Sequence, residues 1–333
     1  MPAVAEPKPV MHVMAAVMLD ALGRVLLAQR PAGKHLAGMW EFPGGKLEPG
    51  ETPMAALARE LREEVGVTLL RGEPLIRVPI HYPERELLLD AWQTDQWEGE
   101  PQSLEGQGLQ WLPPEQVDPS ILTPADRWIL QALRLPTRYA ITPADARPEQ
   151  RGLWFERIGQ AIKRSRQLVQ LRLPLWPREL VRELAAGLLP LARRHGSQLL
   201  LCGDIEGARG LGIGVQLKGR QLATLSERPL PLSHLVGASC HDAADLARAE
   251  QLAVDFATLS PVAATRSRVQ AVPLGWASFR SLAEAAAMPI YALGGMAPSH
   301  IAQARDNSGQ GVAGIREFWA VTPADQRAAA SAR

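Results

Sequence analysis

The sequence predicts an α/β protein of two domains, the second of which is a (β/α)8 barrel. The chain of 333 residues is long enough for two domains of ordinary size. Its first third places short apolar runs around one strongly marked helix. After residue 138, strand-like and helix-like segments alternate, with eight strand-like runs in roughly 180 residues. An open doubly wound sheet is the competing architecture for this second part, but eight units fit a closed barrel better.

The first domain is predicted to contain at least four strands and two helices. The apolar runs at residues 13–19, 24–28, 75–79 and 87–92 are expected to be strands, and residues 53–65 and 124–133 are expected to be helices. Residues 20–23, which include a glycine, are typical of a hairpin connection between the first two strands. Thr123 and Pro124 favour the start of the second helix. We expect this domain to cover residues 10–135.

The second domain is predicted to alternate strands and helices until its sheet closes. The expected strands are residues 139–142, 168–173, 198–202, 214–217, 235–240, 255–259, 289–293 and 311–315. The expected helices are residues 154–163, 180–194, 243–251 and 278–287. This alternation is typical of a TIM-type barrel. We expect the barrel to cover residues 138–319 and the Ala-rich residues 320–333 to form a frayed tail.

The composition excludes several classes of protein. The chain has 36 Lys and Arg against 35 Asp and Glu, a formal net charge of +1, and 46% of its residues are hydrophobic. A disordered acidic chain is therefore excluded, and there is no basic excess for binding a nucleic-acid polymer. The two cysteines, Cys202 and Cys240, indicate a reducing compartment, without a disulfide framework. The apolar run at residues 10–19 is too short for a membrane span, so we expect a cytoplasmic protein with no membrane partner.

The most informative segment is the helix predicted over residues 53–65. Thr52 is a favourable N-cap, Pro53 suits the first turn, and Gly66 suits the left-handed position that ends a helix. A buried stripe is predicted at three apolar positions four residues apart, Leu57, Leu61 and Val65. Another face of the same helix gathers three carboxylates, Glu60, Glu63 and Glu64.

Three carboxylates on one helix face repel one another, so they do not stabilise the helix by themselves. A divalent cation bound between them would replace this repulsion with attraction. Hard oxygen ligands suit Mg²⁺ or Mn²⁺, which can also bind substrate phosphates. The backbone of Gly44 and Gly45, just upstream, can approach closely enough to offer a carbonyl ligand. The alternative is a solvated acidic face partly paired with Arg59 and Arg62.

The full pattern around this helix is more specific than its three carboxylates. It reads G-x5-E-x7-R-E-U-x-E-E-x-G-U, where U is apolar, and every fixed position is satisfied from Gly45 to Val67. This pattern resembles the Nudix box, the motif of enzymes that hydrolyse a nucleoside diphosphate linked to another group. The MutT-type branch, which cleaves oxidised nucleoside triphosphates, is similar also at residues 40–46, 97–101 and 105–107. The resemblance covers residues 10–135 and implies a Nudix α/β/α sandwich.

The resemblance to MutT-type enzymes implies a metal site and a reaction. It assigns Glu64 and the Gly44 carbonyl as metal ligands, with Glu60, Glu63 and Glu105 as further ligands of the metal or of water. The implied reaction is attack of water on 8-oxo-dGTP, which releases 8-oxo-dGMP and pyrophosphate and so cleans the nucleotide pool. Glu60 is the first choice for the base that orients the water and Glu105 the second, with Glu63 as a further catalytic candidate.

Substrate-binding residues are carried over from the same resemblance. They are Arg30, His35, Glu41, Phe42, Pro43, Gly44 and Arg85. Taken singly, such residues are also ordinary core residues, surface ion-pair partners or loop residues. Glu51 is expected to pair with Arg59 and fix the preceding loop onto the helix. The sequence departs from the prototype at Asp126, where the family has Asn: an ionised carboxylate only accepts hydrogen bonds, whereas an amide both donates and accepts.

The second domain resembles thiamine-phosphate synthases and their relatives over residues 138–319. The resemblance rests on four segments, residues 170–172, 237–241, 260–265 and 292–295. All four are expected at the carboxyl ends of strands, where barrels place their active sites. The resemblance implies a phosphate site formed by Arg172, Ser239, Thr265, Gly294 and Gly295.

Two departures argue against synthase chemistry in this barrel. The family has a Lys two residues after the Arg to hold pyrophosphate, and this chain has Leu173-Pro174. The family places a Mg²⁺-binding Asp after the fourth strand, where this chain reads Lys218-Gly219-Arg220. Asp204 is the one candidate left for the other metal ligand. Because the reaction depends on charge neutralisation, we expect a degenerate relative of the synthases.

The sequence therefore predicts a Mg²⁺-dependent hydrolase of a small nucleotide, fused to a barrel. Three alternatives stay open. The substrate is another nucleotide or a thiamine-diphosphate-type compound, the barrel is a phosphate-ligand sensor that regulates the hydrolase, or the barrel itself forms thiamine phosphate.

Overall fold

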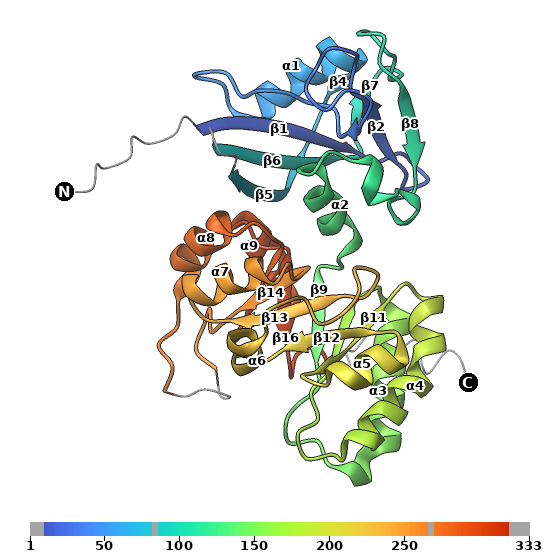
Figure 1. Cartoon of the computed structure of the whole chain (residues 1–333), viewed down its shortest axis with the longest axis vertical. Coiled ribbons are helices and arrows are strands. Elements are labelled where there is room, and N and C mark those ends of the chain that lie inside the picture. Colours follow the sequence, from blue (N-terminus) through green and yellow to red (C-terminus); the bar gives the residue numbers. More distant parts are fainter. Residues whose placement is uncertain (1–9, 82–85, 266–269, 320–333) are drawn as a thin grey trace, which may run out of the picture. The chain divides into compact units, whose positions relative to one another are not determined.

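The computed structural model describes residues 10–81, 86–265 and 270–319 (Figure 1). The predicted tail, residues 320–333, lies outside the described residues. The chain divides into two compact units, which are described separately: the residues up to Arg134 together with Ser281–Pro289, and Leu135–Arg280 together with the residues from Ile290 onward. Over the ranges given above, none of the helices combines the length and the apolar character needed to cross a bilayer.

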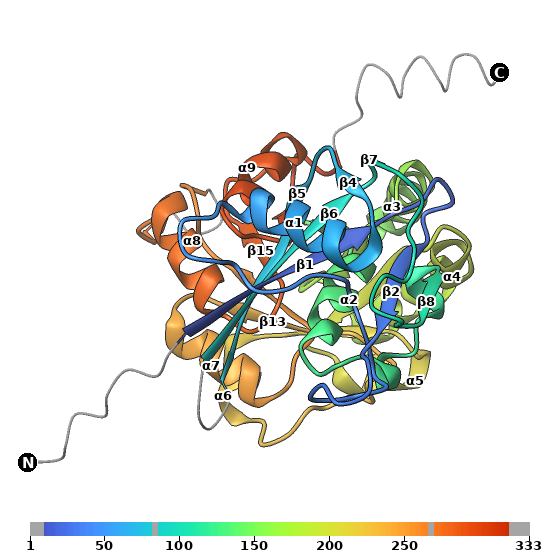
Figure 2. The same cartoon turned by 90° about the horizontal axis from the view of Figure 1, so that it is seen from above.

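The first unit is an α/β/α sandwich around a three-stranded sheet. In this sheet β6 (Glu86–Thr94) lies between β1 (Val10–Met18), to which it is parallel, and β5 (Glu73–His81), to which it is antiparallel (Figure 2). Alternate residues of β1 face opposite ways, as a strand requires. Met14, Ala16 and Met18 pack with α1 (Pro53–Val65), whereas Ala15 and Val17 pack in the cluster that contains α2 (Asp126–Arg134).

The predicted hairpin-like connection at residues 20–23 is present as a turn, but the two strands do not pair beyond it. Residues 20–23 do form a tight turn, in which the Gly23 amide donates to the Asp20 carbonyl at 2.8 Å. Only one isolated bridge, Leu19 to Val25, follows it. The second strand, β2 (Val25–Gln29), instead joins a different sheet, with β3 (Trp40–Glu41) and β8 (Leu109–Leu112). A further pair is formed by β4 (Thr68–Leu69) and β7 (Trp97–Glu98).

Helix α1 begins and ends where its capping residues predict. The Thr52 hydroxyl accepts a hydrogen bond from the Ala55 amide at 3.3 Å, and Gly66 adopts a φ of 73° after the last turn. The predicted stripe, Leu57, Leu61 and Val65, is fully buried. Helix α2 begins at Asp126, two residues later than predicted, because residues 124 and 125 form a turn.

The second unit is a closed barrel of eight parallel strands. Its strands, in chain order, are β9 (Arg138–Ile141), β10 (Leu168–Leu171), β11 (Gln198–Cys202), β12 (Gly214–Leu217), β13 (Val236–Cys240), β14 (Phe256–Leu259), β15 (Ile290–Leu293) and β16 (Gly311–Gly314). Each strand pairs with the next, and β16 pairs with β9, so the open sheet is excluded and the barrel prediction is confirmed. Strand β10 ends at Leu171, which leaves Arg172 in a loop rather than in the predicted strand.

Seven α-helices are described in the second unit. They are α3 (Arg151–Arg164), α4 (Arg178–Arg194), α5 (Ile205–Leu211), α6 (Gly219–Thr224), α7 (Ala243–Gln251), α8 (Gly275–Ala285) and α9 (Ile301–Asp306). Short 3-10 helices cover Pro114–Gln116 and Pro119–Ile121 in the first unit, and Pro148–Gln150 and Pro298–His300 in the second. Three aromatic rings, Tyr139, Phe256 and Tyr291, fill the barrel core. Cys240 is buried and Cys202 partly exposed, and both are free thiols.

Candidate active site

The loop that precedes α1 is fitted against β1 by its two glycines. The Met14 amide donates to the Gly45 carbonyl at 2.7 Å, which holds the loop beside the strand. A side chain at Gly44 would bring its Cβ within 2.2 Å of the Met14 carbonyl oxygen. A side chain at Gly45 would bring its Cβ within 2.3 Å of Cδ of Glu60. Glycine is therefore required at both positions for the loop to meet the helix and the strand at once.

Arg59 connects the loop to the carboxylate face of α1. Its guanidinium donates to both oxygens of Glu51 at 2.9 Å and to Oε1 of Glu60 at 2.8 Å. It also donates to the Lys46 carbonyl at 3.0 Å and lies 3.5 Å from Glu63. The bonds from Arg59 lower the pKa of the Glu51 carboxyl to about 2. Glu60 is thus fixed in place by a cation, whereas Glu63 is mostly exposed.

Glu64, like Glu60, is largely shielded from solvent, whereas Glu63 is exposed. Oε2 of Glu64 accepts a hydrogen bond from the Gly44 amide at 2.8 Å, so it faces the glycine loop. Burial is the main cause that raises its pKa to about 7; the charges of Glu41 and Glu105 act in the same direction, and the Gly44 bond opposes them. Glu64 therefore lies among other carboxylates, of which Glu41 is paired with Arg30 and Glu105 with Lys34.

Glu105 reaches this region from a loop that is fastened to the end of α1. The Gln107 amide nitrogen donates to the Glu64 carbonyl at 2.8 Å, and Oε1 of Gln107 accepts from the Glu105 amide at 2.9 Å. The Glu105 carboxylate itself accepts from Lys34 Nζ at 2.9 Å, in a pair that is about half exposed. Sequence reasoning missed Lys34 and the role of Gln107, although Gln107 belongs to a segment that carried the resemblance.

The donor set of this region fits a hard divalent cation. Among the residues that the structure describes, no three His, Cys, Asp or Glu side chains converge into a ready metal site. The side chains of Glu60 and Glu63 both contact Arg59, and that of Glu105 pairs with Lys34, so cations occupy these carboxylates. The carbonyl of Gly44 accepts no hydrogen bond from a described residue. A free carbonyl beside these carboxylates is an oxygen-only set of the kind Mg²⁺ and Mn²⁺ prefer.

The residues predicted to bind the base lie on β2, β3 and the loops that flank them. Arg30 forms an ion pair with Glu41 and donates through Nε to the His35 carbonyl at 2.6 Å, while the His35 side chain is exposed. Burial raises the pKa of Glu41. Phe42 and Pro43 are buried. Arg85 lies outside the described residues.

Asp126 is buried beside this group. Its Oδ1 accepts from the Phe42 amide at 3.2 Å, a contact across 84 residues of sequence, and its Oδ2 accepts from the Thr123 hydroxyl. Burial raises the pKa of the Asp126 carboxyl to about 7, and the charge of Glu41 acts in the same direction. Because this pKa is near neutrality, both the acid and the carboxylate form are accessible, and the acid form donates as well as accepts.

The predicted phosphate site of the barrel falls at the carboxyl ends of its strands. A cavity of about 580 Å³ there is lined by four of the five predicted residues, Arg172, Ser239, Thr265 and Gly294. Gly295 is not among the lining residues, because it faces the loop after β14, where its Cβ would lie 2.8 Å from the Ala264 carbonyl oxygen. Three further cations of the lining, Arg178, Lys218 and Arg220, were not predicted.

Comparison with known proteins identifies relatives of both units. The NUDIX domain profile matches residues 9–133, and the profile described as thiamine monophosphate synthase matches residues 138–318. CTP pyrophosphohydrolase of Escherichia coli is 41% identical over 130 residues, which cover 39% of this chain and 95% of that protein. 8-oxo-dGTP diphosphatase of the same organism is 32% identical over 124 residues, 37% of this chain and 96% of that protein. Putative thiamine-phosphate synthase 2 of Aquifex aeolicus is 30% identical over 192 residues, 56% of this chain and 99% of that protein.

Proposed function

This chain belongs to the Nudix family through residues 9–133 and to the thiamine monophosphate synthase family through residues 138–318, and we propose that its Nudix hydrolase is a Mg²⁺-dependent pyrophosphohydrolase of nucleoside triphosphates. The observation that carries this proposal is the acidic region around Glu64, which faces a glycine loop with a free carbonyl. A cluster of carboxylates beside a free carbonyl suits a metal ion and the phosphates it brings.

The proposed metal ligands are Glu60, Glu63, Glu64, Glu105 and the carbonyl of Gly44. When bound, Mg²⁺ or Mn²⁺ would neutralise phosphate charge and lower the pKa of the attacking water. Arg59 holds Glu60, and Gln107 holds the loop of Glu105, so two of the carboxylates are positioned before substrate arrives. Glu51, bound to Arg59 by two hydrogen bonds, ties the loop to the helix.

Glu60 is our first choice for the base that orients the attacking water, and Glu105 is the second. Glu60 is fixed by Arg59 and packs against Gly45, whereas Glu105 is about half exposed on a loop. A carboxylate that is partly buried and held by a guanidinium orients a water molecule better than a half-exposed one. Water attack on the triphosphate gives a nucleoside monophosphate and pyrophosphate, and the water's proton passes to the carboxylate. Glu63, which is mostly exposed, is a metal ligand or a further catalytic residue in this scheme.

We propose 8-oxo-dGTP as the preferred substrate, with the base beside Arg30, His35, Glu41, Phe42, Pro43 and Asp126. Several relatives bear the name 8-oxo-dGTP diphosphatase, with identities of 32% to 42%. The acid form of Asp126 offers a donor, and its ionised form an acceptor, so the residue can bind the edge of an oxidised guanine in place of Asn. The buried Phe42 supports this contact through its backbone amide.

CTP is the second candidate substrate, and one observation favours it. The raised pKa makes the acid form of Asp126 accessible, and because this form both donates and accepts, a base with an amino donor next to a ring acceptor can also pair with it. Cytosine carries this pair of groups. The relative named CTP pyrophosphohydrolase, 41% identical, agrees with this possibility. A thiamine-diphosphate-type substrate is the remaining alternative.

A nucleotide panel tests the proposed function. The purified chain is given 8-oxo-dGTP, dGTP, CTP and thiamine diphosphate with Mg²⁺, and products are identified by ion-exchange chromatography and ³¹P NMR. We expect pyrophosphate and the monophosphate from the triphosphates, with 8-oxo-dGTP preferred over dGTP in kcat/KM by about tenfold or more. Release of orthophosphate, or equal rates with 8-oxo-dGTP and dGTP, would overturn the pyrophosphohydrolase or the oxidised-guanine assignment respectively.

The barrel is proposed to have lost synthase chemistry. Pro174 stands at the position of the family's pyrophosphate-binding Lys, and Asp204 is engaged by Arg182 at 2.7 and 2.8 Å. A coupled assay for thiamine phosphate formation should therefore stay at background. A rate above background that depends on the barrel would restore the transferase alternative.

A further inference from the structure

The cavity at the mouth of the barrel carries an unusual excess of positive charge. Four cations line it: Arg172 after β10, Arg178 at the start of α4, and Lys218 and Arg220 after β12. The lining contains a single carboxylate, that of Asp204 after β11. A concave surface lined by one sign of charge concentrates ligands of the opposite sign.

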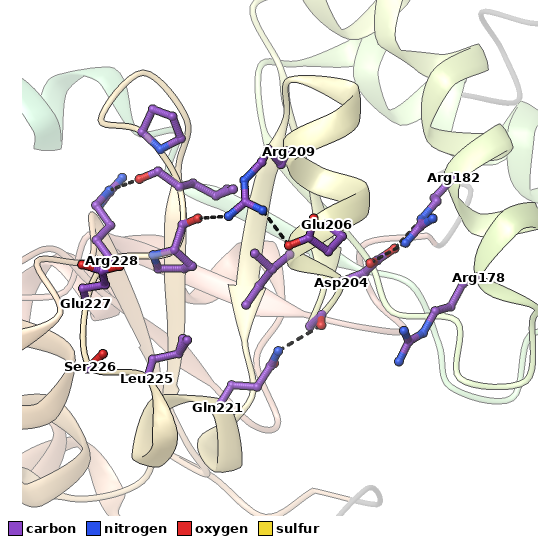
Figure 3. A pocket seen from close by; sticks show the side chains of 15 residues that line it. Arg178, Arg182, Asp204, Glu206, Arg209, Gln221, Leu225, Ser226, Glu227 and Arg228 are labelled. Carbon is purple, nitrogen blue, oxygen red and sulfur yellow. Dashed lines mark hydrogen bonds and ion pairs between the residues drawn. The ribbon is translucent and has the colours of Figure 1, made fainter.

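The single carboxylate does not offset these cations. Arg182 donates to both oxygens of Asp204, through Nε at 2.7 Å and Nη2 at 2.8 Å, and the Gly207 amide donates to Oδ1 at 3.1 Å (Figure 3). The Arg182 guanidinium holds the pKa of Asp204 below its usual range. Asp204 is thus fully occupied as an ion-pair partner and the N-cap of α5. A divalent cation does not fit here, because the loop after β12 offers Lys218 and Arg220 in place of a second carboxylate.

The four cations themselves are unpaired. No hydrogen bond or ion pair joins the side chains of Arg172, Arg178, Lys218 or Arg220 to any other residue within 10–81, 86–265 and 270–319. Figure 3 shows the Arg178 guanidinium joined to none of the drawn side chains. The stem of Lys218 lies over Gly203, where a Cβ would come within 2.9 Å of its Cε. Lys218 therefore passes close to the Asp204 loop without binding its carboxylate.

Part of the cavity lining is apolar and rigid. Trp176 is 6% exposed, and its indole nitrogen donates to the Ala146 carbonyl at 3.0 Å, which fixes the ring. Leu173, three residues earlier in the same segment, is also buried, and Ser239 and His241 are polar residues of the lining. Nδ1 of His241 lies 2.7 Å from the Ser260 carbonyl, so this ring is also fixed. The lining thus combines cations that suit an anion with an apolar surface that suits a ring.

We propose that the barrel mouth binds a diphosphate group directly through Arg172, Arg178, Lys218 and Arg220, without a divalent metal. Guanidinium groups form paired hydrogen bonds to phosphate oxygens, and Lys218 adds a point charge. A diphosphate brings several negative charges to a site that has several unpaired positive ones. The charge neutralisation that a metal and its carboxylates would supply is provided here by fixed side chains. The proposal does not depend on the hydrolase function of the first unit.

Isothermal titration calorimetry on the full chain in EDTA tests this site. The probes are inorganic pyrophosphate, thiamine diphosphate and orthophosphate. The diagnostic variant is Lys218→Gln with Arg220→Gln, and the matched control is Lys163→Gln with Arg193→Gln, which removes equal charge from the helix ends at the other end of the barrel. Far-ultraviolet circular dichroism and the thermal unfolding midpoint, each compared with wild type, report that the barrel of each variant is folded.

We expect a diphosphate probe to bind in EDTA with a Kd below about 0.1 mM, with at least about tenfold loss in the diagnostic variant and less than about twofold loss in the control. Tighter binding of thiamine diphosphate than of pyrophosphate supports an ester as the ligand, with its ring against Trp176. Equal binding of the two supports the free anion. Binding that requires Mg²⁺, equal losses in both variants, or orthophosphate bound as tightly as the diphosphates would each overturn the proposal.

Discussion

The two units of this chain carry opposite charges at their candidate sites. In the Nudix unit, burial and neighbouring carboxylates raise the pKa of Glu64 to about 7, and the available donors are oxygens. At the barrel mouth four cations are unpaired and the lone carboxylate is held by Arg182. Both arrangements suit a phosphate ligand, but the first needs a cation to hold it, whereas the second supplies the cations itself.

A family resemblance can therefore hold for both the fold and the site residues, as in the Nudix unit, or for the fold alone, as in the barrel. Every fixed position of the Nudix box is present, and the structure places Glu64 against the glycine loop. The barrel keeps the closed eight-stranded fold, but the residues at its β12 loop have the opposite charge from that expected of a metal ligand. The same fold is therefore compatible with different ligand chemistry, which is decided by side chains at the ends of the strands.

The largest expected effect is that of replacing Glu64 in the acidic site of the Nudix unit. Glu64→Gln removes the charge that faces the Gly44 loop, so we expect kcat for 8-oxo-dGTP to fall at least about a hundredfold at saturating Mg²⁺. Glu156→Gln, an exposed position on α3, serves as the control and should leave kcat unchanged. The measurement is steady-state kinetics with both proteins. A kcat for Glu64→Gln within threefold of wild type would contradict the carboxylate mechanism.

Replacing Asp126, the buried acid beside the proposed site for the nucleotide base, tests which substrate is preferred. In Asp126→Asn, the amide donates and accepts at once, so the ratio of kcat/KM for 8-oxo-dGTP over CTP should rise by roughly tenfold to a hundredfold. The neighbouring Thr123 hydroxyl can still bond the new side chain. An unchanged ratio in a competition assay would remove Asp126 from base recognition.

The same substitution predicts a change in how stability depends on pH. The pKa of Asp126 rises from 3.8 to about 7, so between these values the native state keeps a proton that the unfolded state has lost. The free energy of unfolding should therefore fall as pH rises from 4 to 7, by roughly 4 kcal/mol for a shift of about three units. In urea unfolding curves the fall should be smaller by this amount in Asp126→Asn, whereas the part due to the raised pKa of Glu64 should remain. If the unfolding free energies of wild type and Asp126→Asn depend on pH in the same way, the pKa of Asp126 is not raised in the native state.

Weakening the contacts of Arg59 tests whether the acidic site is positioned before substrate binds. A lysine at this position reaches one carboxylate rather than the set that Arg59 holds, so Arg59→Lys should lower kcat by about tenfold with little change in KM. Arg62→Lys, exposed on the same helix, is the matched control. If both variants lose activity equally, helix stability rather than carboxylate position explains the loss.

Removing the cation that pairs with Glu105 has the smallest expected effect. Lys34 and Glu105 form a half-exposed ion pair, and such pairs contribute little. Lys34→Gln should change kcat/KM by about twofold, and the difference from wild type should shrink at high salt. A loss of more than about tenfold would assign Lys34 a direct contact with the phosphates.

Local signals explain which elements could be predicted from the sequence. The bounds of α1 follow from Thr52, Pro53 and Gly66, and the eight barrel strands follow from their apolar runs. The pairing of β1 with β6 rather than β2 was not predictable, because strand pairing depends on residues far apart in the chain. The short helices α5, α6 and α9 were missed, since six or seven residues are too few to show a helical period.

The candidate sites also contain features that local sequence predicts and features that arise only when distant segments meet. The helix spacing indicates that Glu60, Glu63 and Glu64 share a face, but the contact of Asp126 with the Phe42 amide joins segments 84 residues apart. The cations at the barrel mouth come from separate loops after β10 and β12, so they form a cluster only once the barrel closes. A signal did exist, because a Lys-Gly-Arg run directly after a predicted strand places positive charge at the functional end of a barrel.

The dependence of the two sites on Mg²⁺ is the most direct test of their difference. One preparation of the full chain is titrated with Mg²⁺ from an EDTA baseline, while pyrophosphate release from 8-oxo-dGTP and binding of thiamine diphosphate are measured. We expect no hydrolysis of 8-oxo-dGTP in EDTA and a rate of hydrolysis that rises with Mg²⁺. Binding of thiamine diphosphate should already be complete in EDTA and should depend on Lys218 and Arg220. Hydrolysis without a metal, or binding that rises in parallel with hydrolysis, would contradict these expectations.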